Sequence, residues 1–402
     1  VAFFFPRVMM DGLLWPFIET AEAVEAHHVQ DWVTAWLTSD DGKVGVRPLA
    51  TYATGFRPTV GLRFFYNRLP GEGSGSTLSI ETAGPGVIIG ELALAAPRWT
   101  GLTFRGLANR RDDRYFAGIG ALTKRDLAER GREPSRFGSD IFSGELRWTR
   151  RLPARFTLSL HGKAEQRDYR AEPVRGGPSI ADVFRLQTPA CNATPAPLAA
   201  CVDPAEVPGF QGGLRILDGG VGLLWDYRSH TRDGSGVGFA LDATLGRGVA
   251  GDPSRFVTYS AEPVFAAGFT DRQLLVRGRA GMVDALDGAP LSFEELVMMS
   301  GYAGLRGFPD GRFRGESGVM GTVEYRWYVA HNLDASLFSD VGTVAGHHFE
   351  GLGTAHWFPD VGVGLRLYHT PGNYWEGALV SGAQLVYAPD NGFRFIFTVA
   401  TF

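Results

Sequence analysis

A strictly alternating segment near the C-terminal end constrains the fold more than any other feature. Residues 319–328 read VMGTVEYRWY, so one set of alternate positions is apolar and the other is largely polar. The apolar set includes Val323 and Trp327, and the polar set includes Glu324 and Arg326. Side chains of a strand point alternately to two faces, so this segment predicts a strand between two different environments. Such a strand is typical of a membrane β-barrel, with lipid outside and a polar lumen inside.

The period of two persists from residue 43 to the C-terminal end and predicts about sixteen strands. The expected fold is therefore all-β: a 16-stranded antiparallel transmembrane β-barrel with a short N-terminal amphipathic helical segment. The expected strands are 43–53, 56–69, 76–84, 86–96, 100–112, 136–150, 154–169, 213–228, 236–248, 255–269, 273–286, 315–329, 332–346, 357–369, 376–389 and 392–402.

The expected connections alternate between short and long. The long ones follow odd-numbered strands, at 113–135, 170–212, 287–314 and 347–356. Barrels of the bacterial outer membrane have short periplasmic turns and long external loops. The pattern therefore predicts an integral, multi-pass protein of the bacterial outer membrane, with both barrel ends on the periplasmic side.

Composition excludes some other classes. The net charge is −4, which gives no overall attraction to nucleic acid. No apolar run approaches the roughly 20 residues that a membrane-spanning helix needs. Barrel strands need only about 9–11 residues, and half of those are polar, so an average hydropathy does not reveal them.

The N-terminal 1–42 region is expected to form a separate helical segment, and 43–402 the barrel. Between Asp11 and Leu37, apolar residues recur at intervals of three and four, which indicates an amphipathic helix at the periplasmic mouth. Its tryptophans suit a membrane interface or a seal against the barrel rim. An ordinary packed helix explains them equally well.

Two cysteines lie close together in a stretch rich in proline and alanine. In an exported protein, Cys191 and Cys201 are expected to form a local disulfide that restrains a long loop. Two free thiols are the alternative.

No catalytic motif is visible: the chain has no GxSxG elbow, HExxH pair or phosphate-binding loop. The adjacent histidines at 27–28 and 347–348 could bind a metal, but neighbouring histidines in a helix or loop usually do not, so neither pair is expected to be a metal site. Glu145 and Glu165 fit solvated lumen charges better than the acids of a membrane hydrolase. We therefore expect no enzymatic activity, no cofactor and no metal.

Three features together resemble the C-terminal barrel of the BamA/TamA outer-membrane assembly superfamily, also called the bacterial surface antigen family. They are the segment Leu305-Arg306-Gly307-Phe308, the strand that carries Glu324, and the segment Phe338-Ser339-Asp340-Val341-Gly342. The resemblance covers about residues 43–402 and is most specific over 301–345.

In that family the tip of the sixth external loop folds back into the lumen. The resemblance therefore implies that Arg306 meets Glu324 and Asp340, with Phe338 and Gly342 as the accompanying strand motif. Strand parity agrees, because it places both acidic residues on the polar face. A buried guanidinium is satisfied by two carboxylates, whereas an unpaired one is costly. A solvated loop arginine is the alternative.

The resemblance also implies a function in inserting or translocating protein or lipid through a lateral seam. Family members that assemble proteins carry periplasmic POTRA modules, and only about 40 residues precede the first strand here. The chain is similar to members without such modules, so a periplasmic or outer-membrane protein partner is expected, together with outer-membrane lipids including lipopolysaccharide. No nucleic acid partner is expected. A passive pore, a structural surface barrel and an outer-membrane enzyme are the alternatives.

The seam is expected where the last strand meets the first. Gly45 and Pro48 weaken the first strand, because proline cannot donate to a ladder. Gly392 and a phase change before Phe402 weaken the last, through a bulge near Ala400 or a poorly paired strand. The pairing between the two strands is therefore expected to be short.

Overall fold

The structure is a computed structural model that describes residues 37–68, 71–97, 99–171, 176–192, 198–229, 234–250, 254–288, 291–330, 333–368 and 379–401. Of the predicted N-terminal helix, only Leu37 belongs to these ranges, and Phe402 lies outside them. Within these ranges, no helix has the length and apolar character needed to cross a membrane.

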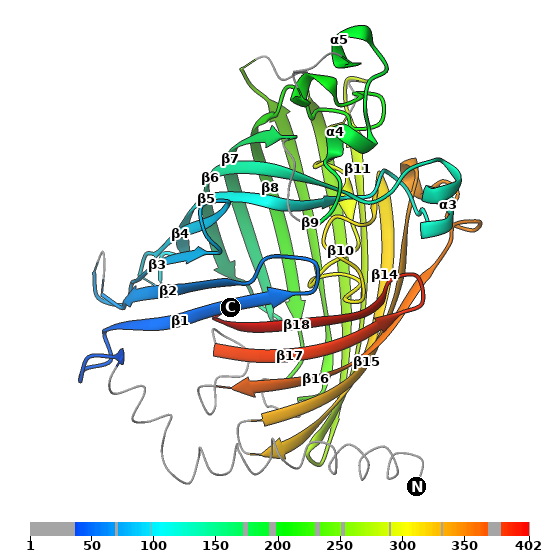
Figure 1. Ribbon diagram of the computed structural model, residues 1–402. Coiled ribbons are helices and arrows are strands. Elements are labelled where there is room, and N and C mark those ends of the chain that lie inside the picture. Colours follow the sequence, from blue (N-terminus) through cyan, green and yellow to red (C-terminus); the bar gives the residue numbers. More distant parts are fainter. Residues whose placement is uncertain are drawn as a thin grey trace, which may run out of the picture.

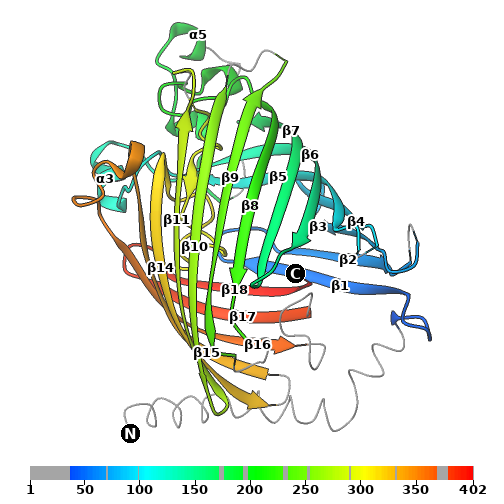
Figure 2. The ribbon, with the colours of Figure 1, turned by 180° about the vertical axis from the view of Figure 1, so that it is seen from behind.

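Sixteen described strands close into one antiparallel barrel, as the alternating pattern predicted (Figures 1 and 2). They are β1 Val44–Ala53, β2 Thr59–Tyr66, β3 Gly75–Thr82, β4 Val87–Ala95, β5 Leu102–Phe116, β6 Ser135–Arg151, β7 Phe156–Arg170, β8 Leu214–Asp226, β9 Gly236–Gly248, β10 Arg255–Phe269, β11 Arg272–Ala285, β14 Ser317–Ala330, β15 Leu333–Ala345, β16 Phe358–Tyr368, β17 Leu379–Ala388 and β18 Gly392–Thr401. Two further strands, β12 Val297–Met298 and β13 Arg314–Gly315, pair inside the loop that joins β11 to β14.

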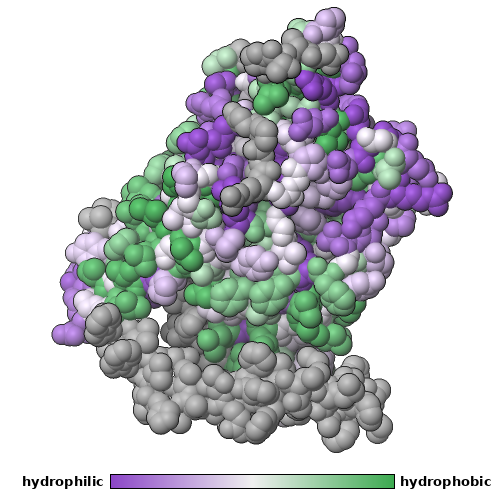
Figure 3. Space-filling model, viewed as in Figure 1, coloured by the Kyte–Doolittle hydropathy of each residue, from purple (hydrophilic) through white to green (hydrophobic). Residues whose placement is uncertain are grey.

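The outer face of the barrel is apolar, as contact with lipid requires. Along β2, Val60, Leu62 and Phe64 are exposed, and Thr59 and Phe65 alternate with them as buried residues. Figure 3 shows hydrophobic residues gathered on the barrel wall below a largely hydrophilic external end. So much exposed apolar surface is stable only in a membrane.

Short helices lie in the external loops; in Figure 1, α4 and α5 are at the upper end and α3 is at the right. They are α3 Lys124–Glu129, α4 Ile180–Val183, α5 Pro189–Asn192, and the 3-10 turns η1 Leu198–Cys201 and η2 His347–Phe349. The predicted disulfide is confirmed: Cys191 and Cys201 are bonded, with 5.5 Å between their Cα atoms. It links α5 to η1.

The external loops share a hydrophobic core that caps this end of the barrel. Phe116 and Phe137 at the ends of β5 and β6 pack with Phe210 and Phe293 from two different loops, and all are almost fully buried. Phe293 contacts the rings of the other three at 5.4 to 6.0 Å between centroids. The connections β5–β6, β7–β8 and β11–β14 thus pack together in one cap.

Among the described residues, the ladder between β1 and β18, which closes the barrel, is the shortest in the barrel wall. Four residue pairs join these two strands, from Ala50 opposite Val399 to Ala53 opposite Ile396. The ladder between β1 and β2 has eight pairs, and that between β17 and β18 has ten. Beyond the four pairs, the Thr54 amide donates to the Phe395 carbonyl oxygen at 2.9 Å.

Candidate functional site

Loop six, residues 286–316 between β11 and β14, folds back against the inner wall of the barrel. Its apolar anchors Leu305, Phe308 and Phe313 are completely buried and pack with Met320 of β14 and Phe358 of β16. The Phe313 and Phe358 rings lie 4.0 Å apart between centroids. This packing fixes the neighbouring residue Arg306 at one position in the lumen.

Arg306 is held by the two carboxylates that the resemblance implied. Its Nε and Nη2 donate to Oδ2 and Oδ1 of Asp340 at 2.8 and 2.9 Å, and its Nη1 donates to Oε2 of Glu324 at 3.1 Å. The guanidinium carbon also lies 3.4 Å from the centroid of the Phe338 ring. Because Arg306 is only 4% exposed, water does not replace these partners.

Glu324 joins this arginine to two more. Its Oε1 accepts from Arg326 Nε at 2.6 Å and lies 2.9 Å from Arg366 Nη2. Arg366 comes from β16, so one buried carboxylate connects β14, β16 and loop six. We call Arg306, Glu324, Asp340, Arg326 and Arg366 the luminal cluster.

Gly307 permits the close approach of loop six to the wall, and Gly342 permits close packing between β14 and β15. A Cβ atom on Gly307 would lie 2.7 Å from the Cβ of Asp360 and 2.8 Å from that of Ala388. The Gly307 amide donates to Asp360 Oδ2 at 2.8 Å. A Cβ atom on Gly342 would lie 2.7 Å from the Cβ of Met320. The sequence motif thus contains glycine where a side chain does not fit.

The last strand also holds loop six, which the sequence did not predict. Arg394 of β18 is buried, and its Nη1 donates to the carbonyl oxygens of Arg306 at 2.9 Å and Phe308 at 2.6 Å. Asn391, in the turn before β18, donates to the Gly307 carbonyl oxygen at 2.7 Å. The strand that closes the barrel is therefore attached directly to the loop tip.

Replacing Arg394 by methionine is expected to loosen this attachment. Methionine keeps much of the apolar stem but leaves two carbonyl oxygens without their donor, at a cost of about 1.5–3 kcal/mol for bonds from a charged group. Cleavage of residues 290–314 by proteinase K should become faster. Arg105→Met is the control, because the Arg105 side chain is 59% exposed in its pair with Glu91, which is not part of loop six. Equal protection in both variants would contradict this role of Arg394.

The structure assigns distinct surroundings to the three described residues of the predicted seam. Pro48 pairs with Leu62 of β2 and precedes Ala50, the first residue opposite β18, so it interrupts no described part of the closing ladder. A Cβ atom on Gly45 would lie 2.4 Å from the Phe65 ring, so this glycine makes room for an aromatic side chain.

Gly392 follows the turn between β17 and β18, where its φ of +82° favours glycine. It therefore shapes a tight hairpin instead of weakening the closing ladder. The ladder between these strands continues without a register shift to Thr401, so there is no bulge at Ala400. Phe393 and Phe395 are exposed on the outer face, and Arg394 between them is buried.

A second buried ion cluster fixes loop six to the opposite wall. Glu294 accepts from Arg314 Nη2 at 2.6 Å and from Arg167 Nη1 of β7 at 2.9 Å. Burial alone would raise the pKa of Glu294, but the charges of the arginines outweigh it and hold the pKa at about 2. Glu294 therefore remains ionised, and loop six has charged attachments on both sides of the lumen.

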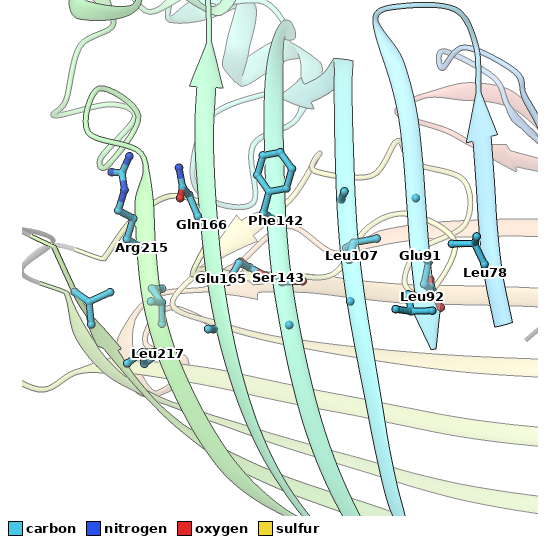
Figure 4. A pocket seen from close by; sticks show the side chains of 17 residues that line it. Leu78, Glu91, Leu92, Leu107, Phe142, Ser143, Glu165, Gln166, Arg215 and Leu217 are labelled. Carbon is cyan, nitrogen blue, oxygen red and sulfur yellow. The ribbon is translucent and has the colours of Figure 1, made fainter. Parts of the chain in front are cut away.

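A recess of about 650 Å³ lies on the outer wall, across β3 to β8 (Figure 4). The recess forms because Gly106, Gly144 and Ala164 lie side by side on neighbouring strands and have small side chains or none. Leu92 and Leu217 continue the same row at its two ends, and both are exposed. Its apolar lining and position suit contact with the acyl chain of a lipid.

Solved structures with the same barrel fold include outer-membrane proteins. BamA from Haemophilus ducreyi lacking POTRA domains 1–3 matches with a TM-score of 0.59 and 12% identity, over 90% of this chain and 70% of that chain. CdiB from Escherichia coli matches with a TM-score of 0.50 and 13% identity, over 88% of this chain and 62% of that chain. No protein-family model matches, and no curated protein matches the sequence.

At these identities the likeness establishes the fold. The closed barrel and its apolar outer face define an integral β-barrel protein of the bacterial outer membrane. The barrel has the same fold as the matching parts of BamA and CdiB, and the chain spans about two thirds of the length of those structures.

Proposed function

We propose that this protein inserts or translocates protein or lipid through a lateral seam between β1 and β18. The observation that carries the proposal is the closing ladder of four residue pairs, which is half the length of the ladder between β1 and β2. Because fewer interstrand hydrogen bonds join β1 to β18, separating these two strands costs less free energy, and the wall opens most easily between them.

The attachment of β18 to loop six supports the same proposal. Arg394 donates to two carbonyl groups of the loop tip, and Asn391 donates to a third. Movement of β18 away from β1 would therefore displace the backbone of Arg306 and so disturb the luminal cluster. Loop six then serves as the element that keeps β18 in place until a client engages.

Two classes of partner accompany this function. A periplasmic or outer-membrane protein would deliver the client to the barrel. Lipids of the outer membrane, including lipopolysaccharide, would contact the apolar belt. The recess around Gly106 and Gly144 suits one acyl chain.

A disulfide across the seam tests the proposal. Thr51 and Thr398 are opposite residues of the ladder. The Thr54 amide bonds to the Phe395 carbonyl oxygen three steps along, so the alternation of an antiparallel ladder makes Thr51 and Thr398 a non-hydrogen-bonded pair. The Cα atoms of such a pair lie about 4.5 Å apart, within the range a disulfide spans. Thr51→Cys/Thr398→Cys is expected to abolish complementation of a deletion strain under oxidising conditions and to restore it after reduction.

The matched control places the same bond within a neighbouring hairpin. Leu62 and Ile80 face each other on β2 and β3, so Leu62→Cys/Ile80→Cys adds a cross-link but leaves the seam free. It should complement under both conditions. Full complementation by the oxidised seam variant would reject lateral opening.

The alternative is a structural surface barrel or a passive pore. The packed cap of external loops, with Phe137 and Phe293 fully buried, favours the structural barrel over an open channel. Single-channel conductance in planar bilayers distinguishes these two, because a capped barrel conducts little.

A further inference from the structure

A group of metal-ligating side chains lies at the external end of the barrel, outside the luminal cluster. His348 Nε2 is 3.1 Å from Asp284 Oδ1, and His347 Nδ1 is 3.6 Å from the same oxygen. Glu316 adds a carboxylate oxygen 3.7 Å from His347 Nδ1. Asp284 is at the end of β11, Glu316 directly precedes β14, and the histidines follow β15, so the group joins three strand ends.

The spacing of these atoms suits one metal ion. Ligand atoms around tetrahedral zinc, at bonds of about 2.0–2.1 Å, lie roughly 3.3–3.4 Å from each other. The three distances, 3.1, 3.6 and 3.7 Å, lie on both sides of that value. One ligand atom from each of Asp284, His347 and His348 lies within 4.8 Å of the other two. In addition, Asp284 Oδ1 is buried and accepts no hydrogen bond from the described residues, so this oxygen faces the two imidazoles with a free lone pair.

The backbone brings the two adjacent imidazoles to the same side. His348 and Phe349 have φ of +49° and +65°, which non-glycine residues rarely adopt. Ser317 supports this turn, because its Oγ donates to the Gly346 carbonyl oxygen at 2.6 Å and accepts from the Phe349 amide at 3.1 Å. As a result, the rings of His347 and His348 lie 3.8 Å apart between centroids.

We propose that Asp284, His347 and His348 form a binding site for a divalent transition metal ion, with Glu316 as a further ligand. Two imidazoles with carboxylates suit zinc, nickel or copper, whereas calcium and magnesium prefer oxygen ligands alone. Adjacent histidines alone gave no reason to expect a metal. The structure adds a third residue, Asp284, from a strand more than 60 positions away.

The ion would close the neck of loop six from outside. The loop leaves the barrel after Asp284 and returns at Glu316, and the Val283 amide already donates to the Glu316 carbonyl oxygen at 2.8 Å. A metal bound to both residues and to the turn after β15 would hold these three strand ends together. This role does not depend on whether the seam opens.

The test is isothermal titration calorimetry, in which zinc is added to the purified, tag-free protein in detergent. One saturable site per chain is expected. His347→Ala and Asp284→Asn should each weaken its affinity at least tenfold, because each removes or neutralises one ligand. His356→Ala is the matched control, since His356 is exposed in the same external loop and lies against the Phe358 ring instead. Its affinity should equal that of the unaltered protein.

A second measurement identifies the coordination directly. Cobalt added in place of zinc should give the visible absorption of a tetrahedral site, and that absorption should disappear in Asp284→Asn. Both variants should keep the heat-dependent gel migration of the folded barrel. The N-terminal histidine pair is replaced by alanine in the background used for every titration, so that it contributes no binding. Absence of a saturable site, or equal affinity in Asp284→Asn and the unaltered protein, would reject the site.

Discussion

Replacing Arg306 by alanine is expected to release the tip of loop six from the barrel wall. The change leaves Asp340 without both bonds of its bidentate pair and removes one of three arginines from Glu324. Removing one partner of a buried pair costs about 3–5 kcal/mol, since the other charge remains buried. Residues 290–314 should become accessible to proteinase K, and the unfolding temperature of the barrel should fall.

An exposed ion pair supplies the control for this variant. Arg105 Nη2 lies 2.7 Å from Glu91 Oε2, but the Arg105 side chain is 59% exposed. Arg105→Ala should change stability by less than about 1 kcal/mol, the usual value for a solvated pair. If Arg306→Ala leaves protease protection as high as Arg105→Ala does, the luminal cluster does not hold the loop.

Replacing Glu324 by glutamine is expected to have an effect at least as large. Glutamine keeps the shape of the side chain but removes the negative charge that contacts Arg306, Arg326 and Arg366. Three guanidinium groups would then lie together with less compensation, which raises the free energy of the folded state by several kcal/mol. Denaturant unfolding, followed by heat-dependent gel migration, measures the loss.

A double variant shows whether these residues act as one unit. Arg306→Ala/Glu324→Gln should be less destabilised than the sum of the single changes, because one variant removes a charge that the other leaves unpaired. Glu145→Gln is the control for the single change, since Glu145 is partly exposed in its pair with Arg147. Strict additivity would show that Arg306 and Glu324 do not interact in the folded protein.

The sequence predicted the barrel well because alternation is a property of neighbouring residues. Side-chain direction along β14 or β16 follows from the period of two, and loop lengths follow from where the period stops. The same parity placed Glu324 and Asp340 on the inner face. The resemblance then supplied the partner, Arg306, and the structure places it within 3.1 Å of both.

Parity alone did not predict which inward residues meet. Arg394 is 88 positions from Arg306. Its place between Phe393 and Phe395 predicts that its side chain points into the lumen. Its height in the lumen, however, depends on strand tilt and on the fold of loop six. Asp360 and Arg366 alternate with valine and leucine in the same way. An inward charge on β16 or β18 was thus a detectable signal, but only three-dimensional packing shows its partner.

The short closing ladder also has a consequence for how the chain reaches its native state. Neighbouring strands elsewhere are mostly joined by hairpins, whereas the seam joins residues such as Thr54 and Phe395, which are 341 positions apart. Bringing such distant segments together costs more chain entropy than forming a local turn. The hydrogen bonds of four residue pairs offset only a small part of that free-energy cost. Closure is therefore favourable only after the intervening hairpins have ordered the wall between the two ends. The ends of the sheet are the last parts to meet during folding and the first to separate.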